Sequence, residues 1–140
     1  MLVPNLTVDQ FISKLYRGAS HVSSEDFQPW ALDLLRRVID FDAAIWGSGH
    51  VSHPVFQSQS CLDVSPTLFD DLQKSIDINP MYNALMNNKG AAINMADVIA
   101  DEDFYQSDIY YQCFQPHGIE RILSSIHLDE PSGSFTLLTL

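Results

Sequence analysis

The side chains in this sequence best suited to chemistry are Cys113 and His117, which lie four residues apart. A cysteine nucleophile needs a neighbouring base and a third group that orients the base, and this short segment supplies no such third group. Cys61 is far away and neither cysteine has CxxC spacing, which indicates two free thiols. The sequence therefore predicts no catalytic residue, and an enzyme is the minority interpretation.

His50 and His53 have the HxxH spacing that begins some metal sites. They precede Pro54 in a segment that does not read as a helix, and no cysteine or group of carboxylates lies nearby. The chain also has no glycine-rich phosphate-binding or nucleotide-binding motif. We predict no metal site and no cofactor.

A dense aromatic segment is the next candidate for function. Its members are Phe104, Tyr105, Tyr110, Tyr111 and Phe114. Aromatic residues bury large areas, so the segment is a core seam, the wall of a small-molecule pocket, or a dimer contact. The hydroxyls of Tyr110 and Tyr111 make them the preferred ligand contacts. His117 follows, either as a loop-fixing residue or as a ligand contact that is sensitive to pH.

Length and composition restrict the class of protein. The chain has 140 residues, of which 46% are hydrophobic and 18% charged, which is typical of one folded domain. The N-terminus does not resemble a signal peptide and no apolar run is long enough to cross a membrane, so a cytoplasmic location is the default expectation. The formal charge of −11 repels phosphate backbones, and we expect this segment not to bind DNA by itself.

Two helices are predicted before residue 40. Thr7 to Gln10 has the pattern of a capping box, and Gly18 is a stop signal for the helix that follows. A second apolar stripe at helical spacing runs from Phe27 to Ile39, and Pro29 would lie in its first turn if the cap is Asp26.

Alternating apolar residues then predict two paired strands over residues 43–49 and 54–61. Two short helices broken at Asn79-Pro80 follow, then a brief strand, the aromatic helix, and two strands over residues 119–128 and 134–140. This order indicates an α+β fold, an antiparallel sheet covered by helices on at least one face. The chain stops inside an apolar strand pattern at Leu140, so we expect a domain truncated at its C-terminal end, with the missing part covering the sheet edge.

Four stretches together resemble a known family: VIDFDAAIWGSG, INPMYNAL, FYQSDIYYQCFQPHGIERILSSI and SFTLLTL. They are similar to the GAF-like sensor domain that precedes the DNA-binding domain of LuxR-type helix-turn-helix regulators, and the resemblance covers residues 20–140. It implies a GAF/PAS-like α/β/α sandwich, a small-molecule effector, a homodimer, and DNA binding only through a C-terminal domain that these residues do not contain. The related acyl-homoserine-lactone receptors hold the lactone with Trp, Tyr and Asp. Here Trp46 lacks the usual tyrosine neighbourhood, and Asn79 precedes Pro80 where an aspartate is typical.

In such sandwiches the central strands form the floor of a pocket and the helices its roof. The residues expected nearest a ligand are Trp46, Phe56, Tyr82 and Tyr110, joined in the candidate set by Tyr105, Tyr111, Phe114 and His117. The alternative is a dimerisation or protein-interaction module whose core is filled.

Overall fold

The computed structural model describes residues 5–140, except for the side chains of residues 53–55. Within these residues five strands form one sheet in the order β2-β1-β5-β4-β3, and every pairing is antiparallel. The strands are β1 (Ala44–His50), β2 (His53–Leu62), β3 (Ile93–Asn94), β4 (Leu123–Asp129) and β5 (Ser134–Thr139).

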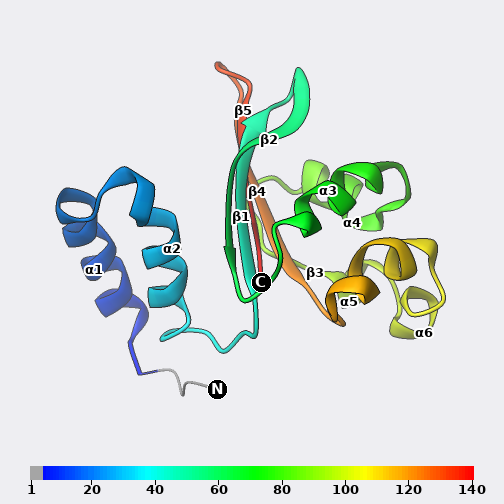
Figure 1. Ribbon diagram of the computed structural model, residues 1–140, viewed down its shortest axis with the longest axis horizontal. Coiled ribbons are helices and arrows are strands. Elements are labelled where there is room, and N and C mark those ends of the chain that lie inside the picture. The colour runs from blue at the N-terminus through cyan, green and yellow to red at the C-terminus, as the bar shows by residue number, and fades with distance from the viewer. Residues whose placement is uncertain (1–4) are drawn as a thin grey trace.

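Helices cover both faces of this sheet (Figure 1). On one side lie α1 (Val8–His21) and α2 (Ser24–Leu35). On the other lie α3 (Thr67–Lys74), α4 (Pro80–Asn87), α5 (Met95–Val98) and α6 (Asp101–Phe104). The predicted α+β class and the three-layer sandwich are confirmed.

The main core lies between the sheet and the layer that begins with α3. Its buried members are Ile45, Leu68, Phe69, Met81, Leu85, Met95, Phe104, Ile109, Cys113, Phe114 and Ile122. Most of these come from helices whose apolar residues recur at three- and four-residue spacing, so one face of each helix is buried against the sheet.

The start of α1 was predicted correctly and its end was not. The Thr7 N–H donates to Gln10 Oε1 at 2.9 Å and the Gln10 N–H donates to Thr7 Oγ1 at 3.1 Å, which completes the capping box. The helix nevertheless continues past Gly18 to His21. Gly18 is buried beneath Trp30 of α2, and a Cβ built there would lie 2.0 Å from the Trp30 ring. This glycine permits close helix packing and does not end the helix.

Replacing Gly18 with alanine tests this packing role, because packing and helix propensity predict opposite signs for the change in the free energy of unfolding. Helix propensity alone predicts a gain of about 1 kcal/mol. Contact with Trp30 should outweigh it, so we expect a net loss of about 1–2 kcal/mol in the free energy of unfolding, measured by urea denaturation. Ser20→Ala, at an exposed position of the same helix, is the control. A stabilised Gly18→Ala variant would contradict the packing argument.

The cap of α2 decides where Pro29 lies in the helix. Ser23 is the cap, because its Oγ accepts the Asp26 N–H at 3.3 Å. Pro29 therefore lies inside the helix, beyond the first turn, where its ring nitrogen cannot donate to the carbonyl of Glu25.

The aromatic segment is not one helix. After α6 the chain forms a π-helix, η2 (Tyr110–Phe114), and a 3-10 turn, η3 (Gln115–His117), and Gly118 ends it with φ of 69°. Pro116 lacks the N–H that a continuous α-helix would need. The backbone therefore changes from the wide turns of a π-helix to the tight turn of a 3-10 helix at this position.

The last strand lies inside the sheet. β5 pairs with β1 on one side and β4 on the other, and the backbone of Leu140 bonds Leu123 at 2.8 and 3.0 Å. The edges of the sheet are β2 and β3, so the apolar end of the chain is paired on both sides. β4 begins at Leu123, so residues 119–122 form an extended segment before it.

Candidate functional site

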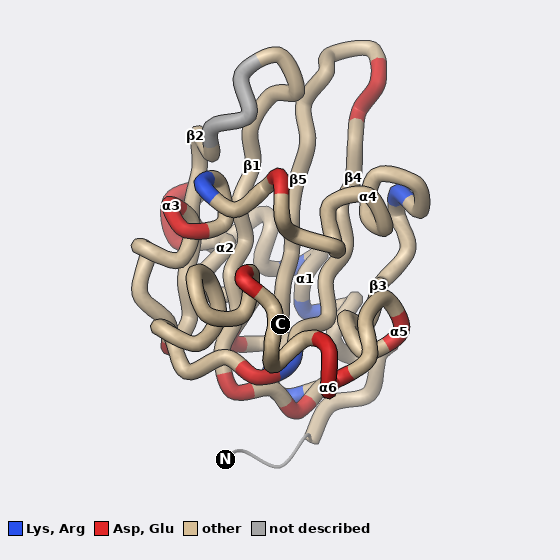
Figure 2. Tube along the Cα trace, turned by 90° about the vertical axis from the view of Figure 1, so that its right-hand side faces the viewer, with Lys and Arg blue, Asp and Glu red and all other residues tan. Residues whose placement is uncertain are grey.

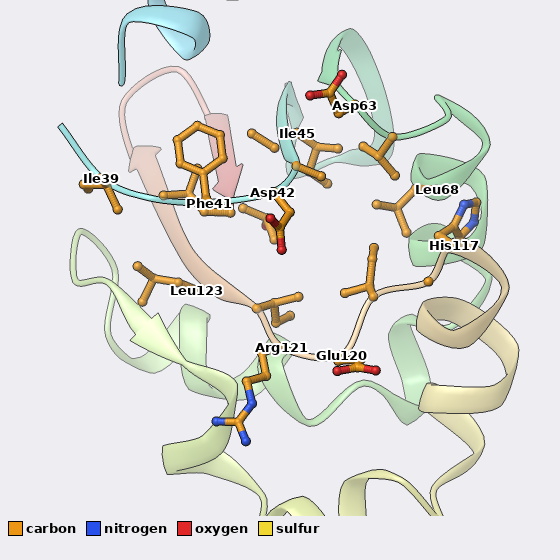
Figure 3. Close-up of a pocket in the computed structure, with 18 of the residues that line it drawn as sticks. Ile39, Phe41, Asp42, Ile45, Asp63, Leu68, His117, Glu120, Arg121 and Leu123 are labelled. Atoms are coloured by element: carbon orange, nitrogen blue, oxygen red, sulfur yellow. The ribbon is translucent and has the colours of Figure 1, made fainter. Parts of the chain in front are cut away.

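An open groove of about 660 Å³ lies where β1 begins and β5 ends (Figure 3). One wall is formed by residues 39–45 and the other by residues 117–123, with Asp63, Val64 and Leu68 beside them. Most small-molecule sites in proteins enclose about 300–1,000 Å³, so the groove has the size of a ligand site.

A smaller cavity of about 50 Å³ adjoins the groove, between the sheet and helices α3 and α4. Both hollows are lined by Ile45, Leu68, Ile119, Ile122 and Thr139. A space of this size accommodates a few water molecules at most. A ligand of ordinary size therefore fits the groove and could reach the inner cavity only with an apolar end.

Arg36 builds the first wall of the groove. Its Nη2 donates to the Asp42 carbonyl at 3.0 Å and pairs with Asp63 Oδ2 at 2.7 Å. Its guanidinium carbon also lies 5.3 Å from the centre of the Phe41 ring, a cation–π distance. Its side chain is only 17% exposed. One partly buried arginine thus holds residues 41–42 against the end of β2.

Tyr105 supports the opposite wall. Its hydroxyl donates to the Glu120 carbonyl at 3.2 Å. Its ring packs on Tyr110 with centroids 5.1 Å apart and on Phe104 with centroids 5.3 Å apart. The aromatic segment therefore positions the extended residues 119–122 that line the groove.

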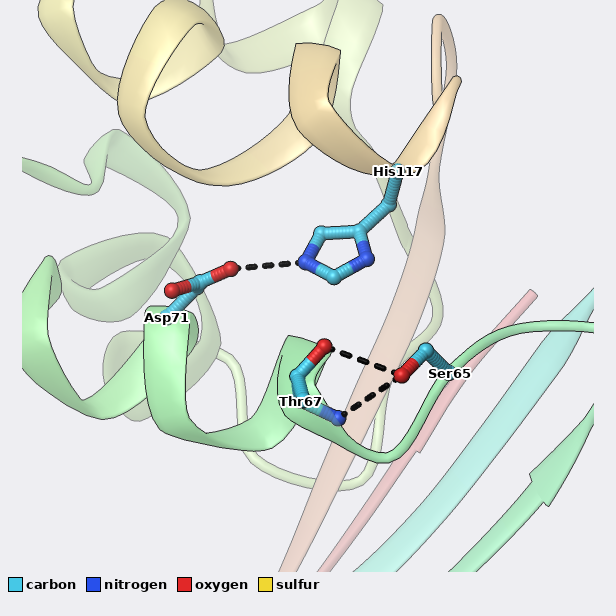
Figure 4. Close-up of polar contacts among 4 residues, drawn as sticks. All are labelled: Ser65, Thr67, Asp71 and His117. Atoms are coloured by element: carbon cyan, nitrogen blue, oxygen red, sulfur yellow. Dashed lines mark hydrogen bonds and ion pairs between the residues drawn. The ribbon is translucent and has the colours of Figure 1, made fainter.

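His117 joins this wall to α3 (Figure 4). Its Nε2 lies 2.7 Å from Asp71 Oδ2, and its side chain is 9% exposed. At the start of the same helix, the Oγ of the preceding Ser65 accepts the Thr67 N–H at 3.3 Å. The Asp71 contact gives His117 the loop-fixing geometry that was one of its two predicted roles, and His117 also lines the groove.

The groove carries more negative than positive groups. Its lining includes Asp40, Asp42, Asp63 and Glu120, and among lysines and arginines only Arg121. The Arg121 Nη2 is paired with Asp101 Oδ2 at 3.0 Å. Figure 2 shows further acidic positions along α6. The acidic side chains that look scattered in the sequence partly gather at this end of the fold.

The structure separates the two strand residues of the candidate set. Trp46 pairs with Ser60, whose Oγ donates to Gln28 of α2, so Trp46 faces the α1–α2 layer, away from the groove. In the described residues its buried indole N–H has no hydrogen-bond partner. Phe56 lies on the other face and packs edge-on against Phe69, with ring centroids 4.8 Å apart.

The remaining aromatic candidates divide between core and surface. Phe114 is 1% exposed and lines the inner cavity. Tyr105 and Tyr110 are partly buried in the ring contacts around Phe104. Tyr111 and Tyr82 are 54% and 44% exposed. The segment thus supplies a core seam and support for the groove wall, while Tyr111 and Tyr82 point to solvent.

Sequence reasoning missed the residues that line both hollows. Ile119 and Ile122 read as strand residues, and Thr139 gave no signal, although its Oγ1 shares a 2.7 Å hydrogen bond with Ser124 Oγ beside the inner cavity. Asn79, which stands where an aspartate is typical of the lactone receptors, caps α4 by accepting the Met81 N–H at 3.0 Å. Of the two histidines with HxxH spacing, the side chain of His53 lies outside the described residues, and His50 Nε2 lies 2.6 Å from the Ser132 carbonyl oxygen.

Cys113 is buried and its thiol is held in the neutral form. Burial, with the nearby charge of Asp71, raises its pKa to about 12, against a smaller lowering effect of the hydrogen bond to Ser75. A thiol with this pKa is a poor nucleophile at neutral pH. The Cys113–His117 pair accordingly lacks the geometry of a catalytic dyad, since His117 pairs with Asp71.

The Cys113 pKa predicts a loss of stability in alkali. The unfolded thiol releases its proton near its ordinary pKa of 9.0, whereas the folded one holds it until about 12. Between these values the unfolded state binds fewer protons, so the free energy of unfolding falls as pH rises. Urea denaturation at pH 7 and pH 10 should show a smaller fall for Cys113→Ala than for the unchanged protein. Equal falls would exclude this thiol as a cause.

None of the helices in residues 5–140 has the length and apolar character needed to span a membrane.

No protein-family model matches the sequence, and no curated protein is significantly similar to it. Solved structures do share its fold. The VqsR ligand-binding domain from Pseudomonas aeruginosa aligns over 94% of this chain and 76% of that chain, with a TM-score of 0.64 and 19% identity. CepR2 from Burkholderia cenocepacia, an N-acylhomoserine-lactone-dependent LuxR-family transcription factor, aligns over 93% and 74%, with a TM-score of 0.58 and 12% identity. At these identities the likeness shows the fold, and the fold implied by the resemblance is confirmed.

Proposed function

We propose that this chain is the ligand-sensing domain of a cytoplasmic LuxR-type transcriptional regulator, and that a small molecule binds in the groove and the adjoining inner cavity. The observation that carries the proposal is the ligand-sized groove of about 660 Å³, which shares five apolar or hydroxyl-bearing lining residues with the cavity beneath the helices. The fold shared with VqsR and CepR2 supports it.

The two walls suggest how binding would be transmitted. Residues 39–43 follow α2, in the layer on one face of the sheet, and residues 118–122 follow η3, on the other face. A ligand that contacts both walls favours one arrangement of the two layers and shifts the population toward it. In a homodimer this shift would change the spacing of DNA-binding domains that lie outside these residues.

Native mass spectrometry of protein purified from cells, with solvent extraction of what is bound, tests the proposal. We expect a stoichiometric small molecule. Ile119→Trp, which fills the boundary between groove and cavity, should abolish that mass while the protein stays folded by circular dichroism. Ile78→Trp is the matched control, because Ile78 is 43% exposed and lines neither hollow. Retention of the small molecule by Ile119→Trp would place it elsewhere.

One observation favours the alternative, a protein-interaction module. Val8, Ile12 and Tyr16 follow one another at four-residue spacing on α1 and are 60%, 44% and 78% exposed. An apolar stripe left open to solvent often marks an association surface. Sedimentation velocity of Ile12→Asp distinguishes the two functions. A protein that carries no small molecule, and whose dimer this variant dissociates, would favour the interaction module.

A further inference from the structure

We infer that the ligand of the groove is an amphipathic cation, a molecule with an apolar body and a protonated amine or similar positive group. This inference rests on the proposed function, because it names the ligand class of the same site. Its grounds are the apolar floor of the groove and the charges of its walls.

The floor suits a hydrocarbon body. Ile45 and Ile122 are buried, at 1% and 7% exposed, and both line the groove and the inner cavity. Phe41 and Ile119 add partly buried apolar surface from the two walls. Burial of an apolar chain here would remove water from both partners, which is the main source of affinity in such sites.

The walls favour a positive head group. Asp42 and Glu120 come from opposite walls of the groove, and Figure 3 shows the Arg121 side chain extending away from its centre. Arg36 neutralises Asp63 at 2.7 Å, and Asp101 neutralises Arg121 at 3.0 Å. Among the described side chains, which leave out residues 53–55, no lysine, arginine or histidine forms an ion pair with Asp40, Asp42 or Glu120. Three carboxylates therefore stay uncompensated around an apolar floor.

The same charges disfavour an anionic ligand. A carboxylate or phosphate in the groove would lose water without gaining a free cation, since Arg36, Arg121 and His117 already have acidic partners. The formal charge of −11 for the whole chain adds a long-range field of the same sign. Charge complementarity thus selects an amine over a fatty acid of equal length.

Isothermal titration with three probes of equal chain length tests the inference: n-octylamine, 1-octanol and octanoate at pH 7. We expect octylamine to bind about tenfold more tightly than octanoate at low salt, with the difference shrinking in 0.5 M NaCl. The double variant Asp42→Asn/Glu120→Gln should remove most of the preference. The double variant Asp33→Asn/Asp77→Asn is the control, because it changes the net charge equally at exposed positions outside the groove.

The outcomes separate this inference from the proposed function. Equal binding of all three probes, abolished by Ile119→Trp, would overturn the cationic preference and leave the sensor proposal standing. Tighter binding of octanoate than of octylamine would also overturn the cationic preference and leave the sensor proposal standing. A control double variant that loses as much preference as the groove variant would assign the effect to net charge and overturn the inference. Failure of all three probes to bind, together with a purified protein free of small molecules, would count against both.

Discussion

Replacing Phe114 with alanine should lower the free energy of unfolding by about 3–5 kcal/mol. Phe114 is 1% exposed, its ring lies 5.8 Å from that of Phe104, and it lines the inner cavity. Truncation would remove its apolar contacts and enlarge that cavity, because the sheet on one side cannot move in to fill the space. Denaturation by urea, followed by far-UV circular dichroism, measures the change.

The enlarged cavity gives a second readout of the same variant. An apolar cavity of sufficient size binds small aromatic molecules, so benzene or indole should raise the melting temperature of Phe114→Ala and leave the unchanged protein unaffected. Tyr111→Ala is the matched control in the same π-helix, because Tyr111 is 54% exposed and should cost less than about 1 kcal/mol. Equal losses for the two variants would contradict the assignment of Phe114 to the core.

Replacing Gly47 with valine should cost about 3 kcal/mol, although valine favours strands. Gly47 lies in β1, which pairs with β2 on one side and β5 on the other. A Cβ at this position would lie 2.5 Å from Cδ1 of Phe56 and 2.7 Å from Cε1 of Phe69. Phe69 is fully buried, so displacing its ring would disturb the close-packed residues around it. The added side chain would push α3 away from the sheet.

The neighbouring residue is the control for this substitution. Ser48 follows Gly47 on the same strand and points to the opposite, partly exposed face, so Ser48→Val should change the unfolding free energy by less than about 1 kcal/mol. Thermal denaturation of both variants compares them directly. A Gly47→Val protein as stable as the unchanged one would show that the two phenylalanine rings can move aside.

Local patterns predicted the fold because each depends on residues close in the chain. The Thr7–Gln10 capping box and the break at Asn79-Pro80 bring together groups three or fewer residues apart, and both occur as predicted. The exceptions were set by distant partners. Gly18 signals a helix end locally, but Trp30 fills the space beside it and the helix continues.

The candidate site was harder to predict for the same physical reason. Aromatic density singled out Tyr105, Tyr110 and Phe114, and these residues support or adjoin the two hollows without forming the groove floor. Alternation along a strand assigns two opposite faces but does not say which face meets which helices, and Trp46 lies on the face away from the groove.

The sequence by itself determined the class of this protein: an α+β fold with an antiparallel sheet, free thiols and a strong excess of acidic residues. These properties follow from hydrophobic periodicity, turn residues and composition, which are local or additive. Only the tertiary structure decided where a ligand could bind. The groove exists because the pairing of β5 between β1 and β4 brings residues 39–45 and 117–123 to the same end of the sheet, and a contact between such distant segments leaves no periodic trace in the sequence.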